Sequence, residues 1–150
     1  MRIYNHLLTT TGAIAVLSHS LPIRIADLPL IFAGAILPDL LDYLLEKHKR
    51  QEDKRNKNIF HSLLLWILLL IASLFFKIRE HLWMFPLGGL IHLLFDCFSN
   101  RGICIIPGIK KRIAFNIYIE GDEIIEDNFT YLVTLSCIGL WLFWQYFKYH

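Results

Sequence analysis

The chain has 150 residues, a net charge of +2 at pH 7 and a mean hydropathy of +0.47. Its hydrophobic share of 55% exceeds that of an ordinary soluble domain, which argues against that class. The length suits one domain over residues 1–150. The charge balance says little by itself, and we expect no nucleic-acid partner. Three cysteines at spacings unlike those of a zinc ribbon or a disulfide framework are expected to remain thiols.

Apolar residues are bunched into long runs, and these runs predict the architecture. Residues 59–76 contain one ionisable side chain, that of His61, and residues 129–147 carry no charge. Each of the two is long enough to cross a hydrocarbon core of about 30 Å at about 1.5 Å per residue. Three weaker runs join them, the first of which is diluted by threonines. We therefore expect an all-α integral membrane protein, a bundle of about five transmembrane helices over residues 7–22, 28–45, 59–76, 82–98 and 129–147.

The segments between these runs differ in composition. Most of the 15 Lys and Arg residues fall in the loops on the N-terminal side. By the positive-inside bias, this predicts a multi-pass membrane protein with a cytoplasmic N-terminus, and that terminus lacks the features of a cleavable signal peptide. Residues 46–58 indicate a solvated, charge-dense connector. Residues 102–120 are rich in β-branched and aromatic residues with a Pro-Gly turn signal, which predicts a short extended or hairpin segment.

Ionisable side chains associated with the apolar runs gather at one end of the predicted bundle. They are His6, Asp39, Asp42, His61, His92, Asp96, Glu123 and Glu126. His92 and Asp96 are four residues apart, and Asp39 and Asp42 are three apart, so each pair shares one face of a helix. Burying such groups at membrane depth costs several kcal/mol each unless they pair, reach water or bind a metal.

Their convergence predicts a metal site. The expected ligands are three histidines and three aspartates: His6, Asp39, Asp42, His61, His92 and Asp96. This donor set suits one or two divalent cations, with zinc as the first choice and manganese or iron as alternatives. Two ions about 3.5–4 Å apart need a bridging carboxylate, which Asp42 or Asp96 can supply.

Each of these residues also has a less specific interpretation. His6 can be an interfacial histidine, and Asp39 and Asp42 can end a helix or pair with Lys47 and Arg50. The two glutamates before the last run occupy positions that the helix dipole favours. Two other classes of function stay open as well. One is a proton or metal transporter, and the other is a non-catalytic membrane module that a structural metal holds together.

Three stretches carry a family resemblance: LPDLLD at residues 37–42, FHSLLL at residues 60–65 and GGLIHLLFDCFSNRGICIIP at residues 88–107. They resemble the motifs of the membrane-bound metal-dependent hydrolases, including the LexA-regulated inner-membrane type, and this resemblance implies a location in the bacterial inner membrane. The chain departs from that pattern at Phe60, where the family usually has threonine, and at Lys57, where it usually has arginine. A looser likeness to zinc-dependent phospholipase C lacks that group's late His-x-x-x-Glu element.

Both resemblances imply hydrolysis, and the position of the site implies its substrate class. A divalent ion lowers the pKa of its water towards 7 and supplies hydroxide at neutral pH. Glu123 or Glu126 is expected as the general base. Arg55, Lys57 and Arg101 are expected to hold a phosphate. We therefore expect membrane lipid as a partner and a lipid or lipid-linked phosphoester as the substrate, cleaved at the cytoplasmic face; the sequence leaves the oligomeric state open.

Overall fold

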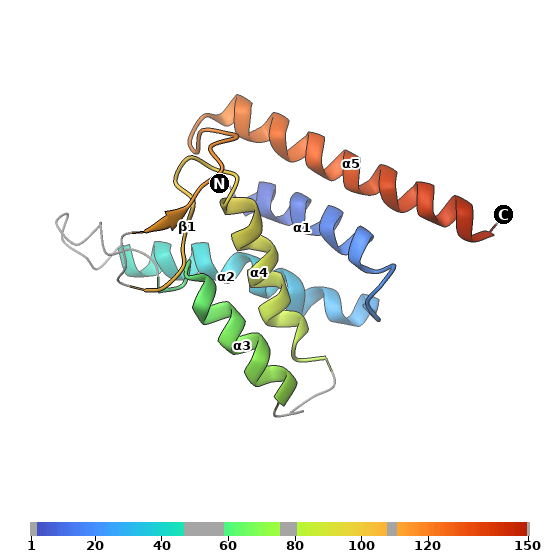
Figure 1. The fold of residues 1–150 in the computed structure, drawn as a ribbon, viewed down its shortest axis with the longest axis horizontal. Coiled ribbons are helices and arrows are strands. Elements are labelled where there is room, and N and C mark those ends of the chain that lie inside the picture. The colour runs from blue at the N-terminus through green and yellow to red at the C-terminus, as the bar shows by residue number, and fades with distance from the viewer. Residues whose placement is uncertain (1–2, 47–58, 76–80, 108–110, 150) are drawn as a thin grey trace.

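The computed structural model describes residues 3–46, 59–75, 81–107 and 111–149 of the chain. Within these residues the α-helices are α1 (Ile3–Leu17), α2 (Leu28–Glu46), α3 (Leu63–Phe75), α4 (Met84–Asp96) and α5 (Glu123–Tyr149). A 3-10 turn, η1 (Ile25–Asp27), precedes α2, and two short strands, β1 (Ile103–Cys104) and β2 (Arg112–Ile113), lie between α4 and α5. Figure 1 shows α4 in the middle of the molecule, with α1, α2 and α3 around it.

Helices α2 and α4 cross in direct backbone contact because a glycine stands on each of them where they meet. A Cβ atom added to Gly34 of α2 would lie 1.9 Å from the carbonyl oxygen of Phe85. One added to Gly88 of α4 would lie 1.9 Å from the carbonyl oxygen of Ile31. The two backbones lie so close together at this crossing that a residue larger than glycine has no room at either position. The crossing fixes α2 and α4 relative to one another.

Helix α3 packs on α4 through Trp66. A Cβ atom on Gly89 of α4 would lie 2.1 Å from the Cε3 atom of that indole ring. The indole N–H donates a hydrogen bond of 2.7 Å to the carbonyl oxygen of Phe60. Ser62 precedes the first helical residue, and its Oγ accepts the Leu65 N–H at 3.4 Å, as an N-cap does. These contacts hold residues 60–62 in place at the start of α3.

Helices α1 and α5, the first and last of the described chain, lie side by side and run in the same direction (Figure 1). Gly12 of α1 allows the close approach, because a Cβ atom there would lie 3.1 Å from the Cβ of Cys137 and 3.2 Å from the Cα of Thr134. Beyond the end of α1, the ring of His19 stacks on that of Trp144 at a centroid distance of 4.2 Å. The two helices therefore stay paired along the length of α1.

The segment between α4 and α5 contains the small sheet, which agrees with the extended structure expected at residues 102–120. Strands β1 and β2 pair antiparallel, with Ile103 opposite Ile113. Gly102 has a φ of +59°, and a Cβ atom there would lie 2.2 Å from the Ile113 carbonyl oxygen, so both conformation and space require glycine. A bridge between Ser99 and Tyr118 attaches the returning chain to the end of α4.

The expected bundle of five transmembrane helices is wrong for the part of the chain that the structure describes, where no helix combines the length and apolar character needed to cross a membrane. Helices α3 and α4 have 13 residues each, or about 20 Å, against a hydrocarbon core of about 30 Å. Helix α1 has 15 residues, α2 contains Pro38 and two aspartates, and polar residues interrupt α5. These findings overturn the spans expected at residues 7–22, 28–45, 59–76, 82–98 and 129–147.

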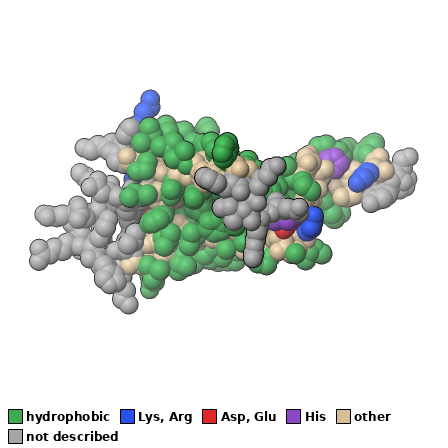
Figure 2. Space-filling view, turned by 90° about the horizontal axis from the view of Figure 1, so that it is seen from below, with side chains coloured by type: hydrophobic (Ala, Val, Ile, Leu, Met, Phe, Trp, Pro, Cys, Tyr) green, Lys and Arg blue, Asp and Glu red, His purple; other side chains and the backbone are tan. Residues whose placement is uncertain are grey.

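Large apolar side chains stay exposed on α3, and Figure 2, which views the molecule from the side of that helix, shows hydrophobic atoms covering most of the described surface. The exposed residues of α3 are Leu64, Ile67, Leu68, Leu69, Ile71, Leu74 and Phe75. Soluble monomers rarely expose contiguous apolar patches of more than a few hundred Å², so this surface is typical of one that meets a partner or lipid.

Candidate metal centre

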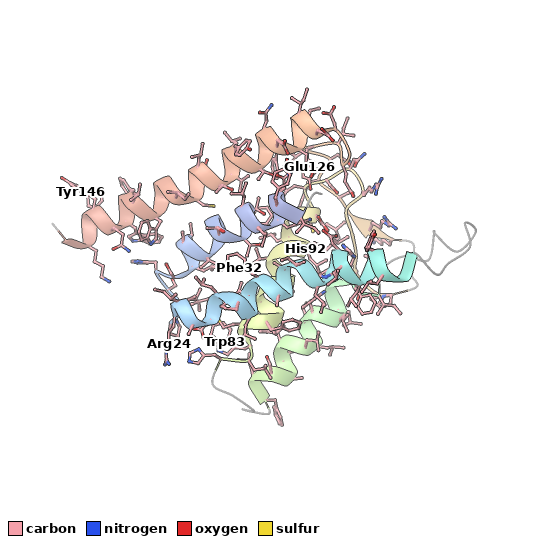
Figure 3. All side chains as sticks on the ribbon, turned by 180° about the vertical axis from the view of Figure 1, so that it is seen from behind. Arg24, Phe32, Trp83, His92, Glu126 and Tyr146 are labelled. Carbon is pink, nitrogen blue, oxygen red and sulfur yellow. The ribbon has the colours of Figure 1, made fainter. Side chains whose placement is uncertain are left out.

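Six side chains from four segments meet at the end of the molecule where α1 and α5 begin. They are His6 of α1, Asp39 and Asp42 of α2, His61 just ahead of α3, and His92 and Asp96 of α4. All six were predicted as ligands because the sequence places them at the same end of the predicted bundle. Figure 3 shows His92 towards the end that carries Glu126 of α5, whereas Arg24 and Trp83 lie at the other end of the molecule.

The histidine Nε2 atoms face two carboxylates at short range. His92 Nε2 lies 3.1 Å from Asp96 Oδ2 and 3.7 Å from Asp39 Oδ1. His61 Nε2 lies 3.3 Å from Asp39 Oδ1 and 3.6 Å from Asp96 Oδ2. His6 Nε2 completes the set, at 3.3 Å from Asp39 Oδ2 and 3.6 Å from Asp96 Oδ1. Three imidazoles thus share the same two carboxylates.

The rings also contact one another. His6 stacks on His92 with ring centroids 3.8 Å apart and planes inclined by 22°. The Nε2 atoms of His61 and His92 lie 3.3 Å apart. Asp42 stands outside this contact, with its Oδ2 3.2 Å from Nδ1 of His61. It is therefore placed to orient His61 from behind, as outer-shell carboxylates orient metal-binding histidines.

Burial and charge set the protonation of these groups. Burial, reinforced by the neighbouring His92, lowers the pKa of His6 to about 3. Burial disfavours the charged form of His61, but hydrogen bonds to the two α2 aspartates outweigh it and raise the pKa to about 10. For Asp96, burial is likewise outweighed, by the three histidines, and the pKa falls well below the ordinary range. The cluster therefore holds anionic carboxylates and a neutral His6 at neutral pH.

The donor set fits a divalent cation. The Nε2 atom of His6, which faces Asp39 and Asp96, is buried without a hydrogen-bond partner among the described residues. A buried polar atom left unpaired costs free energy, which coordination removes for an atom directed at the ion. The 3.1 to 3.7 Å separations are also close to the about 3.3 Å between donors around a tetrahedral ion with bonds of about 2.0 Å.

Two overlapping groups of three ligands emerge within the described residues. The first is His6, Asp39 and His92, and the second is His61, His92 and Asp96. In each group the ligand atoms lie within 4.8 Å of one another. Because His92 belongs to both groups, the arrangement can hold one ion centrally or two ions as neighbours. The identity and number of the ions stay predictions.

Of the residues expected to act as base or to bind phosphate, those that the structure describes belong to neither ligand group. Glu123 is exposed on the first turn of α5, whereas Glu126 is buried and bound to Asn5. Arg101 is exposed and pairs with Glu120 at 3.2 Å. The other two cations expected to bind phosphate, at positions 55 and 57, lie outside the described residues. The roles of all five as base or phosphate binders stay predictions.

Two residues near the cluster were not predicted from the sequence. Asn5 is fully buried beside His6, and Tyr118 is buried with its hydroxyl 3.5 Å from the carbonyl oxygen of Phe95. Burial, and then the charge of the nearby Asp96, raises the pKa of the Tyr118 hydroxyl. The sequence signal for Asn5 was its position next to a candidate ligand. Tyr118 had no such signal, because only the folded chain brings it near α4.

Fold and site together define a class: a mostly helical protein with a buried histidine and aspartate cluster suited to divalent cations. The chain belongs to the YdjM inner membrane protein family, whose model matches residues 1–150. Neither the curated proteins nor the solved structures contain a significant match to the chain. The family description supports the expected location at the inner membrane. The expected multi-pass topology lacks support, because no described helix is suited to span.

Proposed function

We propose that the protein is a metal-dependent hydrolase that cleaves a phosphoester, in a lipid or lipid-linked substrate. The observation that carries the proposal is the convergence of three histidine Nε2 atoms on the carboxylates of Asp39 and Asp96, at 3.1 to 3.7 Å. Mixed histidine and carboxylate ligands are those of hydrolytic zinc, manganese and iron sites. A cluster with more than four candidate ligands also differs from the closed four-ligand set of a structural zinc site.

Each residue has a defined task in this proposal. His6, His61 and His92 bind through Nε2, and Asp39 and Asp96 add anionic oxygen ligands that favour a cation. Asp42 holds the ring of His61 through Nδ1. When bound, a divalent cation supplies a Lewis acid and lowers the pKa of a coordinated water towards 7.

The uneven burial of the ligands indicates the side from which substrate approaches. The side chains of His6 and His92 are 1% and 0% exposed, whereas those of Asp39 and Asp96 are 24% and 14% exposed. Solvent therefore reaches the cluster from the carboxylate side. Arg101 lies a few residues beyond the end of α4, and its guanidinium is exposed. It can bind a phosphate in place of its present partner, the carboxylate of Glu120.

Two observations support a lipid-derived substrate. The protein belongs to an inner membrane protein family, and α3 exposes a continuous set of large apolar side chains. A phosphoester carried on an apolar tail fits both a cation site and an apolar surface. The proposed substrate is therefore a phospholipid or a lipid-linked phosphate.

The test measures metal content and hydrolysis on the same detergent-purified samples. We expect the wild type to carry one or two equivalents of a divalent metal. We also expect it to cleave a phospholipid to a phosphomonoester, or to release inorganic phosphate from a lipid phosphate. His92→Ala is expected to lose both properties. His19→Ala removes an imidazole at the other end of α1, where it stacks on Trp144, and is expected to keep both. A folded wild type that binds neither zinc nor manganese would sink the proposal.

A structural metal is the second candidate, and the full burial of His6 and His92 favours it. It predicts a metal-loaded wild type with no turnover of any phosphoester. It also predicts that removal of the metal lowers the stability of the fold. Hydrolysis of a phosphoester in the test above supports the hydrolase, and its absence in a metal-loaded wild type supports the structural metal.

A further inference from the structure

His6 has an unusual position for a metal ligand. It lies in the first turn of α1, at a helix end, where backbone hydrogen bonds are incomplete. Neither of its ring nitrogens has a hydrogen-bond partner among the described residues. Metal-binding histidines usually donate their second N–H to a carboxylate or carbonyl group, which fixes the ring. For His6 that restraint must come from the backbone that carries it.

The residues just before His6 supply such a restraint. The side-chain amide of Asn5 donates hydrogen bonds of 3.0 Å to Glu126 Oε1 and 3.0 Å to Asp127 Oδ1. The hydroxyl of Tyr4 donates a further hydrogen bond to the same oxygen of Asp127. Asn5 is fully buried and Glu126 nearly so. The first turn of α1 is thus bound to the first turn of α5.

These contacts are strong for physical reasons. Hydrogen bonds to a charged acceptor are stronger than those to a neutral one, and burial protects the bond between Asn5 and Glu126 from water. The positive N-terminal ends of α1 and α5 also lie side by side, and the carboxylates of Glu126 and Asp127 oppose both dipoles. Further along the pair, the close contact at Gly12 resists sliding of one helix past the other. The position of α1 is therefore set by α5.

We propose that Asn5 is a positioning residue of the metal centre, which holds His6 on the cluster by anchoring α1 to Glu126 and Asp127. This inference rests on the proposed metal site and assigns it a support from α5, an element that contributes no side chain to either ligand group in the described residues. The amide of Asn5 acts through the backbone of the next residue. Its loss lets the first turn of α1 move and weakens the contribution of His6 to metal affinity.

The test is a double-mutant cycle in Zn²⁺ affinity, measured on the purified full-length protein by competition with a chromophoric chelator. We expect Asn5→Ala to weaken the affinity about tenfold, the lower end for residues behind a metal ligand. In the His6→Ala background the same change is expected to alter the affinity by less than about twofold, because the ligand that Asn5 positions is gone. Thr11→Ala on the exposed side of α1 is the matched control and is expected to have no effect.

Equal weakening in both backgrounds would mean a general structural role and would overturn the proposal, as would an unchanged affinity of Asn5→Ala. If Asn5→Ala does not fold, two variants of Glu126 test the same contact. Glu126→Gln keeps an acceptor oxygen for Asn5 and is expected to bind Zn²⁺ within about twofold of wild type, whereas Glu126→Ala is expected to lose about tenfold. Equal affinities of the two variants overturn the inference.

The outcomes also separate this inference from the proposed function. A wild type that binds Zn²⁺ but cleaves no phosphoester defeats the hydrolase and leaves the role of Asn5 standing. A wild type that binds Zn²⁺ and is indifferent to Asn5 overturns the positioning role alone. A wild type that binds no metal overturns both.

Discussion

The Nε2 atoms of His61 and His92 lie 3.3 Å apart, each also within 3.7 Å of Asp39 Oδ1. Two imidazole nitrogens in this position repel if both present a lone pair, unless a proton or a cation lies between them. In the metal-free protein the raised pKa of His61 supplies the proton. We predict that a divalent cation bound at this cluster would replace that proton, so that metal uptake at neutral pH would be coupled to proton release.

This exchange predicts how the stability of metal-free protein depends on pH. The pKa of His61, about 10 when folded, exceeds its ordinary value of 6.5. Its contribution is therefore complete below pH 6.5 and disappears as pH rises towards 10. We expect the difference in Tm between wild type and His61→Ala, both stripped of metal, to shrink over that range. A difference that grows with pH would contradict the assignment of the proton to His61.

Asp42 is predicted to act on the metal through His61. Asp42→Asn keeps the shape of the side chain but weakens its hold on Nδ1 of His61, so Zn²⁺ affinity should fall about 10- to 100-fold. Asp122→Asn is the control, because Asp122 accepts the Ile125 N–H at the start of α5 and asparagine caps a helix equally well. Equal affinities of the two variants would remove Asp42 from the site.

The crossing of α2 and α4 yields a prediction for Gly88. Alanine there places Cβ 1.9 Å from the Ile31 carbonyl oxygen and must push the helices apart, which should cost about 1–3 kcal/mol or more. Since Asp39 and His92 lie on these two helices, Zn²⁺ affinity should fall as well. Gly139→Ala meets nothing within 4 Å and should stabilise α5 by up to about 1 kcal/mol. Chemical denaturation in detergent measures both effects.

Metal removal gives a prediction that needs no substrate. Because the folded state alone assembles the ligands, bound zinc should raise Tm in proportion to the logarithm of its free concentration. Treatment with EDTA should lower the Tm of the wild type, and added zinc should restore it. His92→Ala should show the same Tm with and without chelator. A chelator effect that persists in this variant would locate the metal elsewhere.

Sequence spacing predicted which of these side chains are neighbours, because helix geometry alone puts His92 beside Asp96 and Asp39 near Asp42. That four segments would bring these residues to one depth followed from assigning them to successive apolar runs. The structure shows the same convergence. Their function as ligands stays a prediction.

Hydrophobic composition did not predict the lengths of the helices correctly. Within the described residues, the apolar run that begins at residue 59 contains 13 residues of helix, because α3 starts only after its cap at Ser62. Contacts between residues far apart in the chain could not be predicted from the sequence either. No local pattern indicates that Asn5 binds Glu126, a residue 121 positions away. Nor does any local pattern bring Tyr118 to the end of α4.

The pairing of α1 with α5 has a consequence for how the protein is made. The ribosome synthesises His6 first, but the side chains that anchor its backbone are translated 120 residues or more later. Until α5 has been synthesised, the first turn of α1 lacks these partners, and the backbone of His6 is not anchored. If the cluster binds a metal, its full affinity is therefore expected only after translation of α5 is complete.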